Sequence, residues 1–212
     1  MTTRTVIIAG ATGLVGKEIL SGLLADDTVG EIHSLGRRAP GIEHPKLRVH
    51  LVDFADLPSL PSADEVYLAL GTTIKVAGSQ EAFRAVDYTA NLAVAQAALA
   101  AGAKKAGLVS AMGADSRSKV FYSRVKGELE DALQKLPFDG LVVARPSLLV
   151  GNRDALGQPS RRGEEIGFAL GKALGFLIPA NYKPIEAKTV ARALLSAVRS
   201  AKGKKVLLSG SM

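Results

Sequence analysis

A glycine-rich turn near the amino end constrains the fold of this chain more than any other feature. An apolar run, Thr5–Ala9, precedes the turn, and a helical pattern of apolar residues, Leu14–Ala25, follows it. The turn spaces three glycines by three residues, at Gly10, Gly13 and Gly16. We expect the first glycine to permit the tight turn, the second to let backbone N–H groups approach a pyrophosphate, and the third to let the helix pack closely on the strand. The pattern predicts a nucleotide-binding α/β fold.

Strand-like and helical patterns alternate along the rest of the chain. The strand-like runs are Thr5–Ala9, Glu31–Leu35, Leu47–Val52, Glu65–Ala69, Ala106–Ser110, Gly140–Ala144 and Lys205–Ser209. The helical patterns are Leu14–Ala25, Val86–Ala101, Val120–Leu136 and Thr189–Ser200. This alternation predicts one α/β domain over residues 1–212, with a doubly wound, mostly parallel sheet of the Rossmann type. Two prolines within residues 56–62 predict a loop where one crossover helix is missing.

Residues 145–188 have the most irregular composition, with glycines and prolines spread along the segment. We expect this segment to be a small C-terminal substrate-side insertion. Apolar residues at helical spacing within it could cover a substrate pocket, although core packing explains them as well: Ile166, Phe168, Leu170, Ala173, Leu174 and Leu177.

Composition excludes several classes of function. The chain has no Cys, and its three His do not have the close helical spacing of a zinc helix, so no metal site is predicted. The net charge of +7 comes from scattered basic pairs, which argues against nucleic-acid binding. The longest uncharged stretch, residues 88–103, is too short to cross a bilayer, and the N-terminus lacks a signal-peptide layout. We therefore expect a soluble, cytoplasmic protein without a membrane partner.

The end of the second predicted strand favours one form of nicotinamide cofactor. In a dinucleotide-binding fold, an Asp or Glu at this place would bind the adenosine ribose hydroxyls. The chain instead has Arg37 and Arg38, which can hold a 2′-phosphate through charge-assisted hydrogen bonds. NADP(H) is therefore predicted in preference to NAD(H), with a solvated basic turn as the alternative reading.

The glycine spacing, with Ala11 and Thr12 in the gap, resembles that of extended and atypical short-chain dehydrogenases/reductases. The likeness runs over the whole chain and is nearest to the Tat-interactive-protein-like oxidoreductases of the atypical subgroup. It implies that Asp53 and Phe54 meet the adenine, that the turn at Gly71 and Thr72 passes under a cofactor ribose, and that Arg145 and Pro146 lie beside the nicotinamide. The full set of expected cofactor-binding residues is Gly10, Thr12, Gly13, Leu14, Val15, Gly16, Arg37, Arg38, Asp53, Phe54, Gly71, Thr72, Ser110, Tyr122, Lys126, Arg145 and Pro146.

The predicted chemistry depends on Tyr122 and Lys126, four residues apart at the start of a helix and therefore on one helix face. By resemblance, Tyr122 is the general acid toward a carbonyl oxygen, Ser110 orients that oxygen, and Lys126 holds the nicotinamide ribose. A tyrosine at the edge of the core and a lysine extending its ammonium to solvent are the alternative readings. A fourth participant could be Asp87, at a position that is often Asn in extended members, or Asn91.

The sequence thus predicts an NADPH-dependent reductase of a small carbonyl compound, with a small-molecule substrate as its partner. One alternative is a regulatory or interaction protein that binds NADP(H) without turnover. The other is a nucleotide-sugar epimerase, which normally has a longer C-terminal lobe than the 145–188 segment provides.

Overall fold

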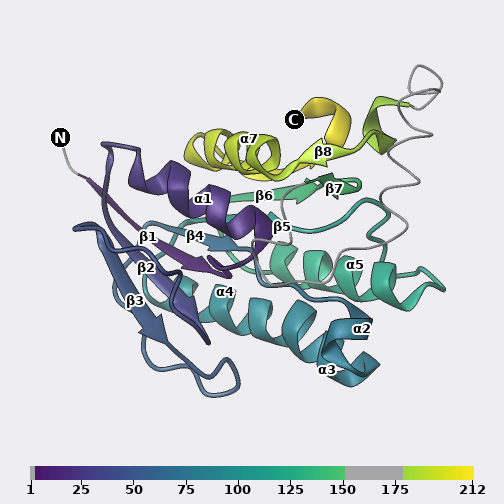
Figure 1. Ribbon diagram of the computed structural model, residues 1–212, viewed down its shortest axis with the longest axis horizontal. Coiled ribbons are helices and arrows are strands. Elements are labelled where there is room, and N and C mark those ends of the chain that lie inside the picture. The colour runs from purple at the N-terminus through teal and green to yellow at the C-terminus, as the bar shows by residue number, and fades with distance from the viewer. Residues whose placement is uncertain (1–2, 151–178) are drawn as a thin grey trace.

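Seven strands form one parallel sheet in the order β3-β2-β1-β4-β5-β6-β9 (Figure 1). The computed structural model describes residues 3–150 and 179–212. The strands are β1 Arg4–Ala9, β2 Val29–Gly36, β3 Leu47–Leu51, β4 Glu65–Leu68, β5 Lys105–Val109, β6 Gly140–Arg145 and β9 Gly203–Leu208. Strand order reverses between β1 and β4, and ligands bind at the carboxyl edge beside such a reversal in doubly wound sheets.

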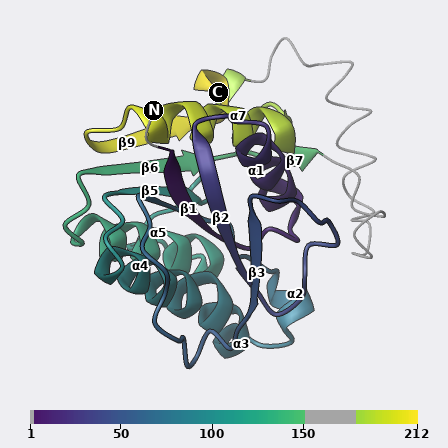
Figure 2. The same cartoon turned by 90° about the vertical axis from the view of Figure 1, so that its left-hand side faces the viewer.

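Helices cover both faces of this sheet, as Figures 1 and 2 show. One face carries α1 (Leu14–Leu24) and α7 (Ala187–Arg199). The other carries α4 (Asn91–Ala100) and α5 (Phe121–Gln134), and η1 (Ala85–Ala90) leads directly into α4 as a wide π-type turn. Shorter elements are α2 Ile74–Ala77, α3 Gln80–Arg84, η3 Ala180–Tyr182 and η4 Ser209–Ser211.

The central strand β1 is buried on both sides, which explains its continuous apolar sequence. Val6 and Ile8 belong to the core beneath α1 and α7, whereas Ile7 and Ala9 belong to the core beneath α4 and α5. All four are fully buried. Successive strand residues point to opposite faces, so a strand between two helical layers needs apolar residues at every position.

The predicted α/β class with a doubly wound parallel sheet is confirmed. The segment at residues 56–62 contains neither helix nor strand, as its prolines predicted. One addition is a second, two-stranded parallel sheet of β7 (Leu149–Val150) and β8 (Ile185–Glu186). Residues 151–178 lie outside the described residues, and with them most of the predicted substrate-side insertion and its apolar residues at positions 166–177.

Candidate active site

A cavity of about 380 Å³ opens at the carboxyl edge of the sheet, where the strand order reverses. It brings together most of the residues that the sequence assigned to cofactor binding, although they come from four separate stretches of the chain. Those that line it are Gly10, Thr12, Gly13, Arg37, Arg38, Asp53, Phe54, Gly71 and Thr72. Its position agrees with the general location of nucleotide sites in doubly wound sheets.

The three glycines of the first turn have different structural roles. Gly10 has a φ of +92°, and a Cβ built on it would lie 2.4 Å from the carbonyl oxygen of Ala69. A Cβ on Gly16 would lie 2.0 Å from the carbonyl oxygen of Gly10, so α1 and the end of β1 can approach this closely only with glycine there. Gly13 is less crowded, with its Cβ position 3.3 Å from the same oxygen, and it lines the cavity. Gly10 and Gly16 therefore shape the turn, whereas Gly13 faces the space for a ligand.

The start of α1 provides hydrogen-bond donors to this region. Gly13 precedes the helix with extended backbone angles, and the first N–H groups of any α-helix lack acceptors inside the helix. Leu14, Val15 and Gly16 do not line the cavity with side chains, and Val15 and Gly16 are buried against the core. Any contact of these three residues with a cofactor would therefore use their backbone.

Arg37 and Arg38 follow the last residue of β2 and are exposed at the mouth of the cavity. Neither guanidinium forms an ion pair with another of the described residues. In the lining of the same cavity, Asp53 Oδ1 accepts a hydrogen bond of 2.9 Å from the Ala55 N–H, while the neighbouring Phe54 packs partly into the core. Within residues 3–150 and 179–212, neither arginine is thus neutralised by a carboxylate.

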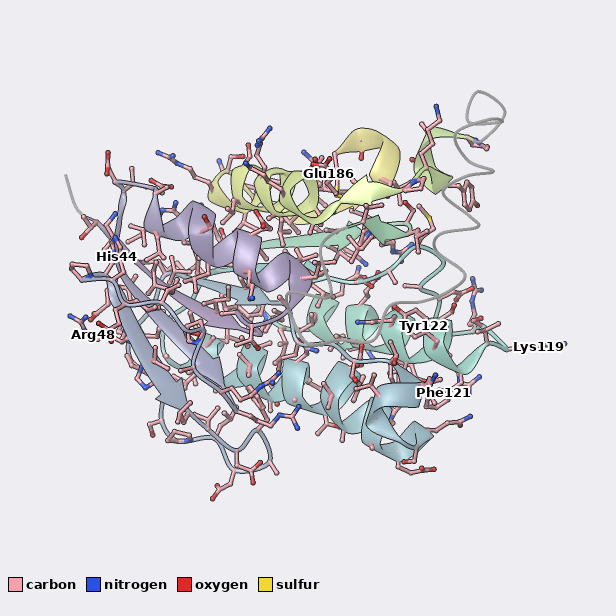
Figure 3. The ribbon with its side chains drawn as sticks, in the orientation of Figure 1. His44, Arg48, Lys119, Phe121, Tyr122 and Glu186 are labelled. Atoms are coloured by element: carbon pink, nitrogen blue, oxygen red, sulfur yellow. The ribbon has the colours of Figure 1, made fainter. Side chains whose placement is uncertain are left out.

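A second cavity, of about 460 Å³, contains Tyr122. Its described lining is mostly apolar and consists of Thr73, Ile74, Ala111, Met112, Tyr122, Pro146, Ser147, Leu148 and Tyr182. Tyr122 lies in the first turn of α5, and its ring packs against the buried ring of Phe83 with the ring centroids 5.5 Å apart. Figure 3 shows Tyr122 at the opposite end of the molecule from His44 and Arg48. The turn after β4 contributes to both cavities, because Thr72 lines the first and Thr73 lines the second.

Lys126 lies one helical turn after Tyr122, and its ammonium forms a buried ion pair. The Nζ atom lies 2.7 Å from Asp87 Oδ1. Burial raises the pKa of the Asp87 carboxyl above its ordinary value, against the opposing effects of the Lys126 ammonium and the Thr72 N–H. Lys126 therefore lies inside the protein beside the turn whose residues line both cavities.

Ser110 differs from its expected role. Its hydroxyl donates a 2.6 Å hydrogen bond to Glu130 Oε1 and does not line the cavity of Tyr122, where the following residues Ala111 and Met112 lie instead. Glu130 is almost fully buried on α5, so it draws the Ser110 hydroxyl into the interior. Of these three residues only Tyr122 lines a cavity, whereas Lys126 is paired with Asp87 and the hydroxyl of Ser110 is paired with Glu130.

Arg145 belongs to the same buried cluster and also differs from its expected place. Its guanidinium makes a bidentate pair with Glu130, with Nη2 2.6 Å from Oε2 and Nε 3.0 Å from Oε1. These bonds raise the pKa of Arg145, which is charged throughout the ordinary pH range in any case. Arg145 does not line the second cavity, whereas Pro146 does. The cluster ties the ends of β5 and β6 to α5.

Sequence reasoning missed Glu130, Phe83, Thr73 and Tyr182. For Glu130 a signal was present, because Tyr122, Lys126 and Glu130 recur at intervals of four residues and so share one face of α5. The other three depend on contacts between distant parts of the chain. Asp87 was considered as a participant, but its partner was not identified.

No family model matches the chain. Among curated proteins, the mitochondrial protein FMP52 of Candida albicans is 36% identical over 194 residues, covering 87% of this chain and 83% of its own length. The mitochondrial FMP52 protein of Coccidioides immitis is 35% identical over 212 residues, covering 91% of this chain and 85% of its own length.

Solved structures share the fold at low sequence identity. A short-chain dehydrogenase family protein from Francisella tularensis has a TM-score of 0.72 at 11% identity and covers 99% of both chains. A UDP-N-acetylglucosamine 4-epimerase from Methanobrevibacter ruminantium has a TM-score of 0.70 at 15% identity, covering 98% of this chain and 77% of that one. The enzyme WbmH of Bordetella bronchiseptica, solved with NAD+, has a TM-score of 0.70 at 18% identity and covers 99% and 77%. The fold is therefore that of short-chain dehydrogenases and related epimerases, while the Tat-interactive-protein subgroup is not among these findings.

The relatives correct the predicted location and identify the family. The expectation of a cytoplasmic protein is wrong, because the FMP52 relatives are named as mitochondrial proteins. That expectation rested on the missing secretory signal and membrane span, and neither bears on mitochondria. Within the described residues, no helix combines the length and the apolar character needed to cross a membrane. With more than a third of residues identical over more than four-fifths of both chains, this chain belongs to the family of the FMP52 proteins.

Proposed function

We propose that this protein is an NADP(H)-dependent oxidoreductase that reduces a small carbonyl compound, with Tyr122 as the proton donor. The observation that carries the proposal is that consecutive residues of one turn, Thr72 and Thr73, line the two cavities, with the Lys126 ammonium buried beside that turn. In this reading residues 1–212 act as one domain, and residues 145–188 lie on the substrate side.

The first cavity fits a dinucleotide. Gly13 lines the cavity without a side chain, and the first turn of α1 has N–H groups that can bind a pyrophosphate. Arg37 and Arg38 suit a ribose 2′-phosphate and form the basis for preferring NADP(H). The solved enzyme of the same fold from B. bronchiseptica contains NAD+, which supports a nicotinamide cofactor more generally.

The second cavity fits the reacting group. A reduced nicotinamide, when bound, supplies the hydride that the carbonyl carbon accepts. Tyr122 would donate its phenolic proton to the carbonyl oxygen, which completes the alcohol, and the phenolate would then regain a proton from solvent. Lys126 would hold a ribose hydroxyl and stabilise the phenolate through its positive charge. The described lining contains no charged side chain, which favours an uncharged substrate.

A nucleotide-sugar epimerase is the second candidate, because epimerases are among the proteins of similar fold. Those from M. ruminantium and Thermotoga maritima were solved with a UDP-linked sugar. Each is longer, since this chain covers 76–77% of their lengths. A protein that binds NADP(H) without turnover is the third candidate, but such a protein has no need of the Tyr122 hydroxyl.

Substitution of Tyr122 by Phe tests the proposal. Tyr122→Phe removes one oxygen and retains the ring that packs on Phe83. NADPH oxidation should be followed with a panel of aldehydes, ketones and quinones, and with UDP-sugars tested separately for epimerisation. We expect wild-type turnover on a carbonyl compound, at least a hundredfold loss in Tyr122→Phe, and NADPH affinity within about threefold of wild type. Turnover that survives in Tyr122→Phe contradicts its role as the acid, and epimerisation without carbonyl reduction favours the second candidate.

A further inference from the structure

The carboxylate of Asp87 forms a buried ion pair with the Lys126 ammonium, and the proposed reaction gives Asp87 no role. The Lys126 side chain is 6% exposed and that of Asp87 is 1% exposed. A lone buried charge is strongly unfavourable, so each group makes the burial of the other possible. A Cβ built on Gly71 would lie 3.6 Å from Asp87 Oδ1 and 3.9 Å from Lys126 Nζ. The pair thus lies directly against the turn that lines the first cavity.

Both carboxylate oxygens of Asp87 face a hydrogen-bond donor. Oδ2 accepts a 2.8 Å hydrogen bond from the Thr72 N–H, and Oδ1 lies 2.7 Å from the Lys126 ammonium. An Asn at this position has one oxygen and one NH2 group, so it would turn a donor toward either Thr72 or Lys126. The position therefore suits Asp, because only a carboxylate turns an oxygen toward the Thr72 N–H and the Lys126 ammonium at once.

The wide turn η1 fixes where Asp87 lies. Asn91, also buried, donates from Nδ2 to the carbonyl oxygen of Leu70 at 3.1 Å and to that of Val86 at 3.2 Å. These bonds join η1 and the first residue of α4 to the turn after β4. Asp87 is consequently held by its backbone, independently of the lysine with which it pairs.

We propose that Asp87 is a positioning residue that holds the Lys126 ammonium beside the Gly71 turn, where it can reach the ribose of a nicotinamide cofactor. This inference rests on the proposed function, because it takes a cofactor ribose to lie over that turn. Asp87 acts through Lys126 and does not itself touch the cofactor. Without the carboxylate, the ammonium loses the contact that fixes its place and its side chain has other rotamers available.

A double-mutant cycle separates this role from a purely structural one. NADPH affinity is measured by fluorescence titration for the wild type, Asp87→Asn, Lys126→Met and the double variant. We expect each single substitution to raise the Kd at least tenfold, and the double variant to stay within threefold of Lys126→Met. The effect of Asp87 is then absent once its lysine is gone. Steady-state kinetics on any substrate found should show the same lack of additivity in kcat.

Two further variants keep the test decisive. Glu128→Gln removes a carboxylate from the same helix, where it pairs with Arg84 away from both cavities, and it should leave NADPH affinity within twofold of wild type. Should Asp87→Asn fail to fold, Asp87→Glu replaces it in the cycle, because it keeps two acceptor oxygens but moves them by one methylene. We expect Asp87→Glu to lower NADPH affinity at least threefold in the wild-type background and to have no further effect when Lys126→Met is already present.

The possible failures are distinguishable. Additive effects of Asp87→Asn and Lys126→Met overturn the positioning role and leave the proposed oxidoreductase standing, because Asp87 would then act only through the Thr72 turn. Unchanged affinity in Asp87→Asn also overturns the positioning role alone. A wild-type protein that binds neither NADPH nor NADH overturns both the inference and the proposed function.

Discussion

The contrast between Gly13 and Gly16 gives the sharpest prediction about the cofactor cavity. Gly13→Ala adds one methyl group at a position whose backbone angles, φ −80° and ψ 169°, suit any residue. The new Cβ would lie 3.3 Å from the Gly10 oxygen, so the neighbours need to move by only a few tenths of an ångström. We expect a loss of about 1 kcal/mol of stability, comparable to a poorer N-cap residue, and a fall in Tm of about 2–4 °C.

Binding should respond far more than stability. The methyl group would point into the space that a pyrophosphate must enter to reach the N–H groups of α1, so NADPH affinity should fall by at least tenfold, or about 1.4 kcal/mol. Isothermal titration calorimetry on the folded variant measures this loss. Undiminished NADPH binding to Gly13→Ala would refute the assignment of this turn to the pyrophosphate.

Gly16→Ala is the matched control, with the same added atom three residues further on. Its Cβ would lie 2.0 Å from the Gly10 oxygen, and ordinary contact begins at about 3.4 Å. The helix would have to move away from β1 by about 1.4 Å, at a cost of about 3 kcal/mol or more. Urea unfolding should therefore show a large loss of stability for Gly16→Ala and a small one for Gly13→Ala. Equal losses would contradict the different roles that we give to the two glycines.

Two further predictions concern charge. Arg37→Asp should lower NADPH affinity by about 1–3 kcal/mol and leave NADH affinity nearly unchanged, as measured by paired titrations; equal losses for both cofactors would contradict a 2′-phosphate contact. Asp26 tests the dependence of stability on pH: partial burial alone would raise the pKa of its carboxyl, but hydrogen bonds from Thr28 and an ion pair with Arg4 together lower it. Because the pKa of Asp26 is lower in the folded state, the carboxylate adds stability at pH values above its unfolded pKa of about 3.9. That stability is lost as the pH falls through the folded-state pKa. The urea midpoint should therefore drop less between pH 5 and about 2 in Asp26→Asn than in the wild type.

The sheet could be predicted from sequence because its signals are local. The apolar run of β1 needs no partner to be recognised, and the three glycines mark the turn after it. The prolines of residues 56–62 likewise determine their own backbone. By contrast, β7 and β8 have only two residues each and form because distant segments of the chain pair. No local sequence pattern predicts them.

The site was predictable to the extent that strand ends determine it. Residues that follow parallel strands must gather at one edge, which is why Gly10, Arg37, Asp53 and Gly71 line one cavity. The direction of a side chain at that edge is a different matter. Ser110 ends its strand at the expected edge, yet its hydroxyl turns inward to a carboxylate twenty residues away. Such a choice depends on the buried partner, and the pattern of one strand carries no information about it.

The buried polar groups also link the linings of the two cavities through one turn. The turn after β4 contributes Gly71 and Thr72 to the first cavity and Thr73 to the second. Its backbone forms hydrogen bonds with the side chains of Asp87, in η1, and Asn91, which follows η1. Both residues are fully buried. Lys126 joins the same group from α5, the helix that carries Tyr122. A displacement of this turn would therefore alter the first cavity, the position of Lys126 and the lining of the second cavity together. No side chain of η1 lines the second cavity. Substitutions in η1 should nevertheless change cofactor affinity and turnover in parallel.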